Sequence, residues 1–214
     1  MSDTISPAQF HAQEGVAEWR VLFTGAHAHW RTASLAEGVR FASALADAVA
    51  GLGRTPDIDL RPRDVVVRTA AADFALDAVD VEIAQRVSRT AASLGLIADP
   101  SVLQVVNVNV ARHPDVDVRP FWNAALGYED LWDSDAVDPN GRGPQLAFND
   151  IERGGRGRTH LDVSVPFDDG ERRVHAALAA GGRLVDERPG LWWTLASPDN
   201  HGVDIAVWPD ARAG

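Results

Sequence analysis

The sequence contains no cysteine, and this absence excludes three classes of chemistry. Disulfide bonds, thiol catalysis and zinc sites with cysteine ligands all require the missing side chain. No uninterrupted apolar run is long enough to span a bilayer, and residues 1–13 lack the apolar segment of a signal peptide. We therefore expect a cytoplasmic protein that has no membrane partner.

Lysine is also absent, so all 20 basic residues are arginines, and 31 acidic residues outnumber them. The formal net charge is -11 at pH 7. Nucleic-acid binding rests largely on neutralising phosphates with basic side chains, so an acidic chain without a basic tract predicts no nucleic-acid partner. The 45% hydrophobic residues are typical of a globular protein, and 214 residues suffice for one or two domains.

The first half of the chain has the pattern of an α+β fold. Residues 1–15 are polar and turn-forming, and we expect them to form a loosely held lead-in. Ser34, with Glu37 three residues later, has the pattern of a helix capping box. Apolar spacing then predicts helices over 35–52 and 77–94 and strands over 18–23, 26–32, 58–60 and 65–68. This order predicts an antiparallel sheet with helices on one face.

The segment 54–61, between the two predicted helices, reads Arg-Thr-Pro-Asp-Ile-Asp-Leu-Arg. It resembles the active-site turn of pterin-4a-carbinolamine dehydratases, and the segment 30–34 looks like the start of that family's first helix. The resemblance covers residues 18–94. It implies a dehydratase-like first domain, which we place at residues 1–98.

The dehydratases use three histidines as acid and base on a 4a-hydroxytetrahydropterin, and the matching positions here are Arg54, Thr55 and Ala72. Arginine stays protonated at neutral pH, threonine has no useful pKa, and alanine has no proton to give. We therefore expect dehydratase activity to be absent. Two interpretations stay open: a scaffold without a ligand, or a site that still binds a pterin or small anion through Arg54, Thr55, Asp57 and Asp73.

His27 and His29 share one face of their predicted strand, because side chains alternate with period two. We expect that face to be solvated or to lie at an interface. A pair of relocated catalytic histidines is the alternative.

The second half repeats one pattern of strand, helix and strands. Asp99-Pro100 disfavours helix continuation, so we place a second domain at residues 102–209. Within it, the first copy predicts a helix over 120–128 and strands over 102–110, 128–133 and 145–151. The second copy predicts a helix over 171–180 and strands over 160–165, 183–187, 191–196 and 203–208.

This repeat resembles the glyoxalase/bleomycin-resistance, or vicinal oxygen chelate, superfamily, as do the segments 158–163 and 197–201. The two halves in tandem are similar to a fused arrangement of actinobacterial type. The resemblance implies a paired βαβββ domain and metal-ligand positions that fall here on Asn107, Asn149, His160 and Asp204. His160 and Asp204 are good ligands for a divalent metal, whereas the two amides are weak donors, so we expect at most a weakly held metal and no other cofactor.

Five of the seven tryptophans lie in this half, and Trp122 and Trp193 are candidate ligand-binding residues. Tryptophan offers a large apolar face and one N–H donor. Either Trp192 and Trp193 divide between the core and the outer face of one strand, or at least one lines a pocket for a flat ligand.

These observations predict a small-molecule-binding, dehydratase-like and glyoxalase-like fusion protein without dehydratase activity. Its expected partners are a pterin-like or aromatic ligand and a second copy of itself in a homodimer. One alternative is an active lyase or dioxygenase-type enzyme in the glyoxalase-like half. Another is a non-catalytic dimeric scaffold or sequestering protein.

Overall fold

The computed structural model describes residues 4–112, 114–115, 117–150, 159–196 and 202–208. The chain divides into two compact units, each with a sheet of its own. Unit 1 comprises residues 1–103 and 208–214, and unit 2 comprises residues 104–207. No helix in the described part of the chain is long and apolar enough to cross a membrane.

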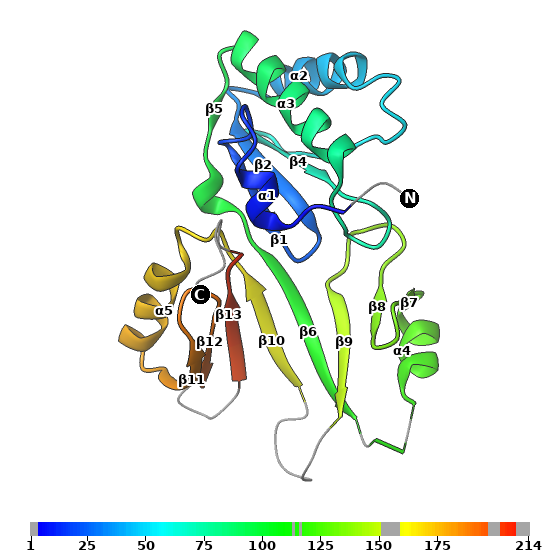
Figure 1. The fold of residues 1–214 in the computed structure, drawn as a ribbon, viewed down its shortest axis with the longest axis vertical. Coiled ribbons are helices and arrows are strands. Elements are labelled where there is room, and N and C mark those ends of the chain that lie inside the picture. Colours follow the sequence, from blue (N-terminus) through cyan, green and yellow to red (C-terminus); the bar gives the residue numbers. More distant parts are fainter. Residues whose placement is uncertain (1–3, 113, 116, 151–158, 197–201, 209–214) are drawn as a thin grey trace. The chain divides into compact units, whose positions relative to one another are not determined.

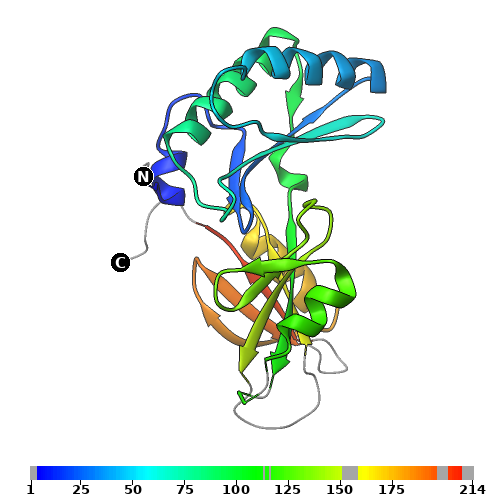
Figure 2. The same cartoon turned by 90° about the vertical axis from the view of Figure 1, so that its right-hand side faces the viewer.

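Unit 1 is an antiparallel sheet covered on one face by two helices (Figure 2). Its strand order is β1-β2-β4-β3, and the short β5 pairs with β2. The strands are β1 (Trp19–Leu22), β2 (Gly25–Arg31), β3 (Asp57–Leu60), β4 (Asp64–Thr69) and β5 (Ile97–Ala98). The helices are α1 (Pro7–His11), α2 (Leu35–Ala48), α3 (Ala78–Ser93) and the 3-10 helix η1 (Pro100–Val102). The predicted α+β class is confirmed.

Strand alternation decides which face of this sheet becomes the core. On β2, Ala28 and Trp30 face the helices and are buried against Phe41 of α2 and Val87 of α3. The Ser34 side chain accepts the Glu37 amide proton at 3.3 Å, as the capping pattern predicted, while the Glu37 carboxylate accepts from the Ala33 amide at 2.6 Å, one residue before the N-cap. Capping and apolar periodicity therefore fix both the start of α2 and its buried face.

The predicted loose lead-in is wrong. Residues 7–11 form α1, which Ser6 and Gln9 cap reciprocally and which has Pro7 at its first turn. Phe10 is fully buried in the core of unit 1, and Ile5 forms a β-bridge with Leu76. One buried aromatic ring and a complete capping box hold this segment against the rest of the unit.

Unit 2 is an eight-stranded sheet built from two βαβββ copies, as the superfamily resemblance implied (Figure 1). The first copy is β6 (Val105–Arg112), α4 (Arg119–Leu126), β7 (Glu129–Leu131), β8 (Asp135–Val137) and β9 (Gln145–Asp150). The second is β10 (Thr159–Ser164), α5 (Gly170–Ala179), β11 (Arg183–Arg188), β12 (Trp192–Ala196) and β13 (Gly202–Ala206). The strand order is β11-β12-β13-β10-β6-β9-β8-β7.

The two copies in the sheet of unit 2 have the same pattern of strand pairing. The first and last strands of each copy pair in parallel, β6 with β9 and β10 with β13, and β6 pairs with β10 antiparallel where the copies meet. One face carries two apolar clusters, one with residues of α5 and one with residues of α4. The opposite face is free for polar side chains, and it positions the candidate site of this unit.

Candidate functional site

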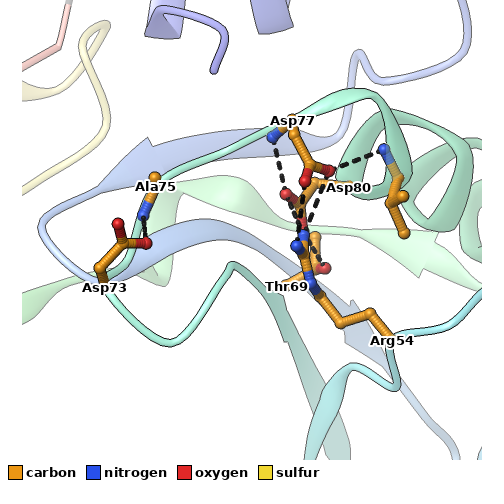
Figure 3. A network of polar contacts seen from close by, with 7 residues as sticks. Arg54, Thr69, Asp73, Ala75, Asp77 and Asp80 are labelled. Carbon is orange, nitrogen blue, oxygen red and sulfur yellow. Dashed lines mark hydrogen bonds and ion pairs between the residues drawn. The ribbon is translucent and has the colours of Figure 1, made fainter. Parts of the chain in front are cut away.

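In unit 1, Arg54 occupies the first of the three positions that we matched to the dehydratase histidines. It forms ion pairs with Asp77 and Asp80 (Figure 3). The Arg54 guanidinium donates to Asp80 at 2.5 Å and to Asp77 at 3.0 Å. Asp80 also accepts from the Thr69 hydroxyl at 2.6 Å and from the Asp77 amide at 2.9 Å. These carboxylates, acting against partial burial of the guanidinium, raise the pKa of Arg54. Arg54 is therefore a cation held by three hydrogen bonds to the carboxylates of Asp77 and Asp80.

The other candidate residues of unit 1 do not gather around Arg54. Asp57 pairs with Arg68, Thr55 is exposed, and Asp73 accepts the Ala75 amide at 3.2 Å within its own turn (Figure 3). Ala72 is exposed and adds no functional group. The ligand role predicted for this set gains no support from the arrangement, because its one cation is bound to internal carboxylates.

The two histidines of β2 are not solvated, contrary to one of our two expectations for that face. His27 and His29 are 8% and 7% exposed. They lie on the sheet face opposite α2 and α3, because Ala26, Ala28 and Trp30 alternate with them toward the helices. His27 Nε2 lies 3.0 Å from Thr24 Oγ1, and His29 Nε2 lies 3.8 Å from Asp64 Oδ1.

In unit 2, six polar side chains form one continuous row across six neighbouring strands. Residues that pair across strands share a face, so the register alone places them together. Running from the β11 edge inward, the row is Asp186, Thr194, Asp204, Asp162, Asn107 and Gln145. We call this row, with the neighbouring His160, Asn109 and Asn149 on the same face, the polar face.

His160 lies at the centre of the polar face beside two carboxylates. Its Nε2 atom is 3.1 Å from Asp162 Oδ1 and 3.8 Å from Asp204 Oδ2. Hydrogen bonding to Asp162 raises the pKa of His160 although partial burial opposes the shift. Burial raises the pKa of Asp204, and the negative charges of Asp162 and Asp186 act in the same direction. The cluster therefore contains more acceptors than its single imidazole can pair.

Several buried polar atoms of this face have no hydrogen-bond partner among the described residues. They are Asn107 Oδ1, Asn109 Nδ2 and Gln145 Oε1, in side chains at most 6% exposed. The Asn109 oxygen does accept from the Asn149 amide at 2.6 Å, and the Gln145 amide donates to Asp135. Unpaired buried polar atoms cost free energy, so the face is suited to a ligand that supplies the missing partners.

The tryptophans divide as strand alternation requires. Trp193 is buried in the apolar cluster that includes Val174 of α5, and Trp122 packs against the α4-side cluster. Both therefore lie on the sheet face opposite the polar face, and their predicted ligand-binding role stays a prediction. Trp192, one residue earlier, is half-buried and lies on the polar face, since it shares a strand face with Thr194.

All four positions that the superfamily resemblance named lie on this face. Asp204 pairs with Asp162 across strands, Asp162 pairs with Asn107, and His160 pairs with Asn109, while Asn149 follows on β9. The segment 197–201 and residue 158, which also carried the resemblance, lie outside the described residues.

The family model for a glyoxalase-like domain matches residues 106–206. This part of the chain is a glyoxalase-like domain. The chain is also similar to two solved structures. "Oxidase ChaP-H2" is 20% identical, with coverage of 53% of this chain and 99% of that chain and a TM-score of 0.23. A hypothetical protein SA1046 from S. aureus is 16% identical, with coverage of 46% and 92% and a TM-score of 0.20.

No curated protein matches the chain. The two structural likenesses are too low to say anything of its activity. The comparison that bears on the site is the family match, which spans the polar face of the glyoxalase-like domain from Asn107 to Asp204.

The glyoxalase-like domain has a donor set that fits a divalent cation. One ligand atom each from His160, Asp162 and Asp204 lies within 4.8 Å of the other two. Imidazole and carboxylate suit Zn²⁺, Mn²⁺ or Fe²⁺, and the neighbouring Asn107 Oδ1 is an unused acceptor. Sequence reasoning named His160 and Asp204 and missed Asp162. The two-residue spacing in His160-Leu161-Asp162 was the available signal, since it places both side chains on one strand face.

Proposed function

We propose that the polar face of the glyoxalase-like domain binds a small planar molecule that carries N–H donors, as a pterin-like ring does. The observation that carries this proposal is the six-residue row, which is rich in carboxylate and amide oxygens and contains no arginine. Such a row accepts hydrogen bonds and repels anions. A ring that presents two adjacent N–H groups can be held by one carboxylate in a bidentate manner.

A planar ligand is supported by the position of Trp192. Trp192 pairs with Ala206 across the strands and lies two residues from Thr194, which pairs with Asp204, so the indole and this carboxylate lie on the same face of the sheet. A flat ring bound at Asp204 can stack on this indole while its edge meets the carboxylate. This combination of an apolar wall and a few convergent polar groups is typical of small-molecule sites.

His160 would act as the pivot of the site. An imidazole can donate from one ring nitrogen and accept at the other. The Asp162 Oδ1 atom is buried and has only the 3.1 Å ion pair with His160 among the described residues. Removal of the imidazole would therefore leave a buried carboxylate oxygen without a partner, as well as removing a contact to the ligand.

Calorimetric titration with pterin tests the proposal. We expect His160→Ala to weaken pterin binding by roughly 1–3 kcal/mol, which is the cost of leaving a buried polar group unpaired. Asp204→Asn should also weaken it, because the bidentate carboxylate is lost. The matched control is His175→Ala, which removes an exposed imidazole from α5 and should leave the affinity unchanged. Equal affinity in wild type and both site variants would overturn the proposal.

A second function is favoured by the three-ligand cluster of His160, Asp162 and Asp204. A divalent metal held there would supply Lewis-acid chemistry for the alternative function, an active lyase or dioxygenase-type enzyme. Titration with Mn²⁺ alone, followed by electron paramagnetic resonance, separates the two functions. Stoichiometric binding that Asp162→Asn abolishes would favour the enzyme over the binding protein, and no stoichiometric binding would favour the binding protein.

We infer that unit 1 is dehydratase-like and has no dehydratase activity. The order of its elements supports the likeness, and the Arg54 ion pairs with Asp77 and Asp80 support the loss. Each missing acid or base removes roughly 10²–10⁴-fold of rate. We expect the purified protein to leave dehydration of a 4a-hydroxytetrahydropterin at its buffer rate. Turnover near that of a relative with all three histidines would contradict this.

A further inference from the structure

Unit 1 contains a cavity of about 520 Å³ that the proposed function does not use. It lies where β2 and β4 pair Arg31 with Asp64. The Arg54 network contacts Thr69, at the opposite end of the same strand pair. This cavity is therefore separate from the dehydratase-like positions, and ligand binding in it is independent of the pterin proposal.

Two arginines and one carboxylate define the charge of this cavity. Arg31 is anchored by Asp99, whose Oδ2 accepts from two of its nitrogens at 2.5 and 3.1 Å. Arg63 is exposed at the rim and has no carboxylate within ion-pair distance in the described part of the chain. Asp64 also lines the cavity, 3.8 Å from the His29 imidazole.

The wall contains two buried polar side chains with unused capacity. His29 and Thr32 are 7% and 6% exposed and both line the cavity. His29 Nδ1 and Thr32 Oγ1 have no hydrogen-bond partner among the residues that the structure describes. A backbone hydrogen bond of 2.8 Å from the Thr32 amide to the Arg63 carbonyl joins the residue after β2 to the turn before β4. Val66 and Val102 supply the apolar part of the wall.

We propose that this cavity binds a small carboxylate that carries a hydroxyl group next to an apolar tail. The free guanidinium of Arg63 pairs with the ligand carboxylate, because arginine matches its two oxygens with two parallel N–H groups. Asp64 accepts the ligand hydroxyl. The tail lies against Val66 and Val102, and rotation of the Thr32 hydroxyl adds a further hydrogen bond to the carboxylate.

Asp64 favours a carboxylate over a phosphate as the ligand of this cavity. A negative charge in the wall repels a dianion more strongly than a monoanion. It also rewards a ligand that has a hydrogen-bond donor beside its anionic group. A 2-hydroxy acid satisfies both conditions. Inorganic phosphate is partly dianionic at neutral pH and so satisfies the first condition less well, and it has no apolar tail to pack against Val66 and Val102.

The experiment compares mandelate with phenylacetate, which differs by the missing hydroxyl, and with inorganic phosphate. Binding to the full chain is followed by titration of NMR signals from His29, Thr32 and the Arg63 side chain. We expect mandelate to saturate these shifts with a dissociation constant of roughly 1 mM or below, and phenylacetate to bind more weakly. Arg63→Gln should weaken mandelate roughly tenfold or more, because a charge-assisted hydrogen bond is lost.

Two further variants make the result specific. Asp64→Asn should reduce the preference for mandelate over phenylacetate while retaining binding of both. Arg61→Gln is the matched control, because Arg61 is exposed in the same turn, pairs with Asp59 and does not line the cavity. The proposal is overturned if no probe saturates, if phosphate binds more tightly than mandelate, or if Arg61→Gln weakens binding as much as Arg63→Gln.

Discussion

His27 is kept neutral by its surroundings. Its side chain lies on β2 in unit 1, and the ring contacts Thr24. Burial, and then the positive charge of Arg68, lower the pKa of His27 to about 3 from an ordinary value of 6.5. A charged imidazole is thus disfavoured in the folded state by both effects.

This shift predicts a pH dependence of stability. Between pH 6.5 and 3, the unfolded chain takes up a proton at His27 that the folded chain does not. The stabilisation is therefore fully present above pH 6.5 and is lost as the pH falls toward 3. In the wild type this proton uptake should lower the free energy of unfolding by up to about 1.4 kcal/mol per pH unit, the value for one proton. We expect the His27→Gln variant to lack this contribution. Denaturation at several pH values, read by hydrogen exchange in β2 and β4, measures it.

Other ionisable groups also contribute to the pH dependence of stability, so the difference between the wild type and His27→Gln is the informative quantity. His175→Gln changes an exposed histidine in the other unit and serves as the control. Parallel stability profiles for the wild type and His27→Gln would show that burial of this imidazole has no energetic consequence.

The type of a residue predicted which acid–base chemistry it can carry out, but not which other residues it contacts. That Arg54 cannot act as an acid follows from its type alone. Its ion-pair partners Asp77 and Asp80 are 23 and 26 residues further along the chain, and no local sequence pattern indicates such a pairing. For Trp192 and Trp193 the alternation was clear, but which one faces the core depends on the strand register. A shift of one residue reverses every side chain.

At the scale of elements, the sequence predicted both unit folds because apolar periodicity is strong in both. The helices α2 and α3 and most strands of the repeat follow directly from spacing and stop signals. Of the hairpin of β7 and β8, the sequence predicted one strand over 128–133, which corresponds to β7, and did not predict β8. The turn of this hairpin uses Trp132 at a φ of 54°, where glycine or asparagine is the usual signal. The residue types therefore gave no signal for a turn at this position.

The polar face was predictable only in part, because it depends on how distant strands pair. His160 and Asp204 were named by resemblance, and strand pairing brings them together across β10 and β13. The full row depends on five pairings among strands that are distant in sequence. Each pairing has a register that the sequence does not display, so the row is a property of the sheet as a whole.

At the scale of the molecule, the hydrophobic cores of the two units share no residue within the described ranges. The core of unit 1 includes Phe41, which is fully buried and packs edge-on against Trp30 at 5.4 Å between ring centroids. The α5-side core of unit 2 includes Leu195, which is 1% exposed. Because a domain with its own core can unfold as a unit, separate cores predict separate unfolding events.

Truncations in the two cores should therefore act locally. Phe41→Ala should destabilise unit 1 by roughly 3–5 kcal/mol and Leu195→Ala should destabilise unit 2 by roughly 2–5 kcal/mol, through lost burial and the cavity left behind. Hydrogen exchange resolves the two effects: the first variant should speed exchange in α2 and β4, and the second in β12 and β13. Each variant is the other's control. If either change accelerated exchange equally in both units, the chain would unfold as one cooperative body, and the two functions proposed here could not be separated by such truncations.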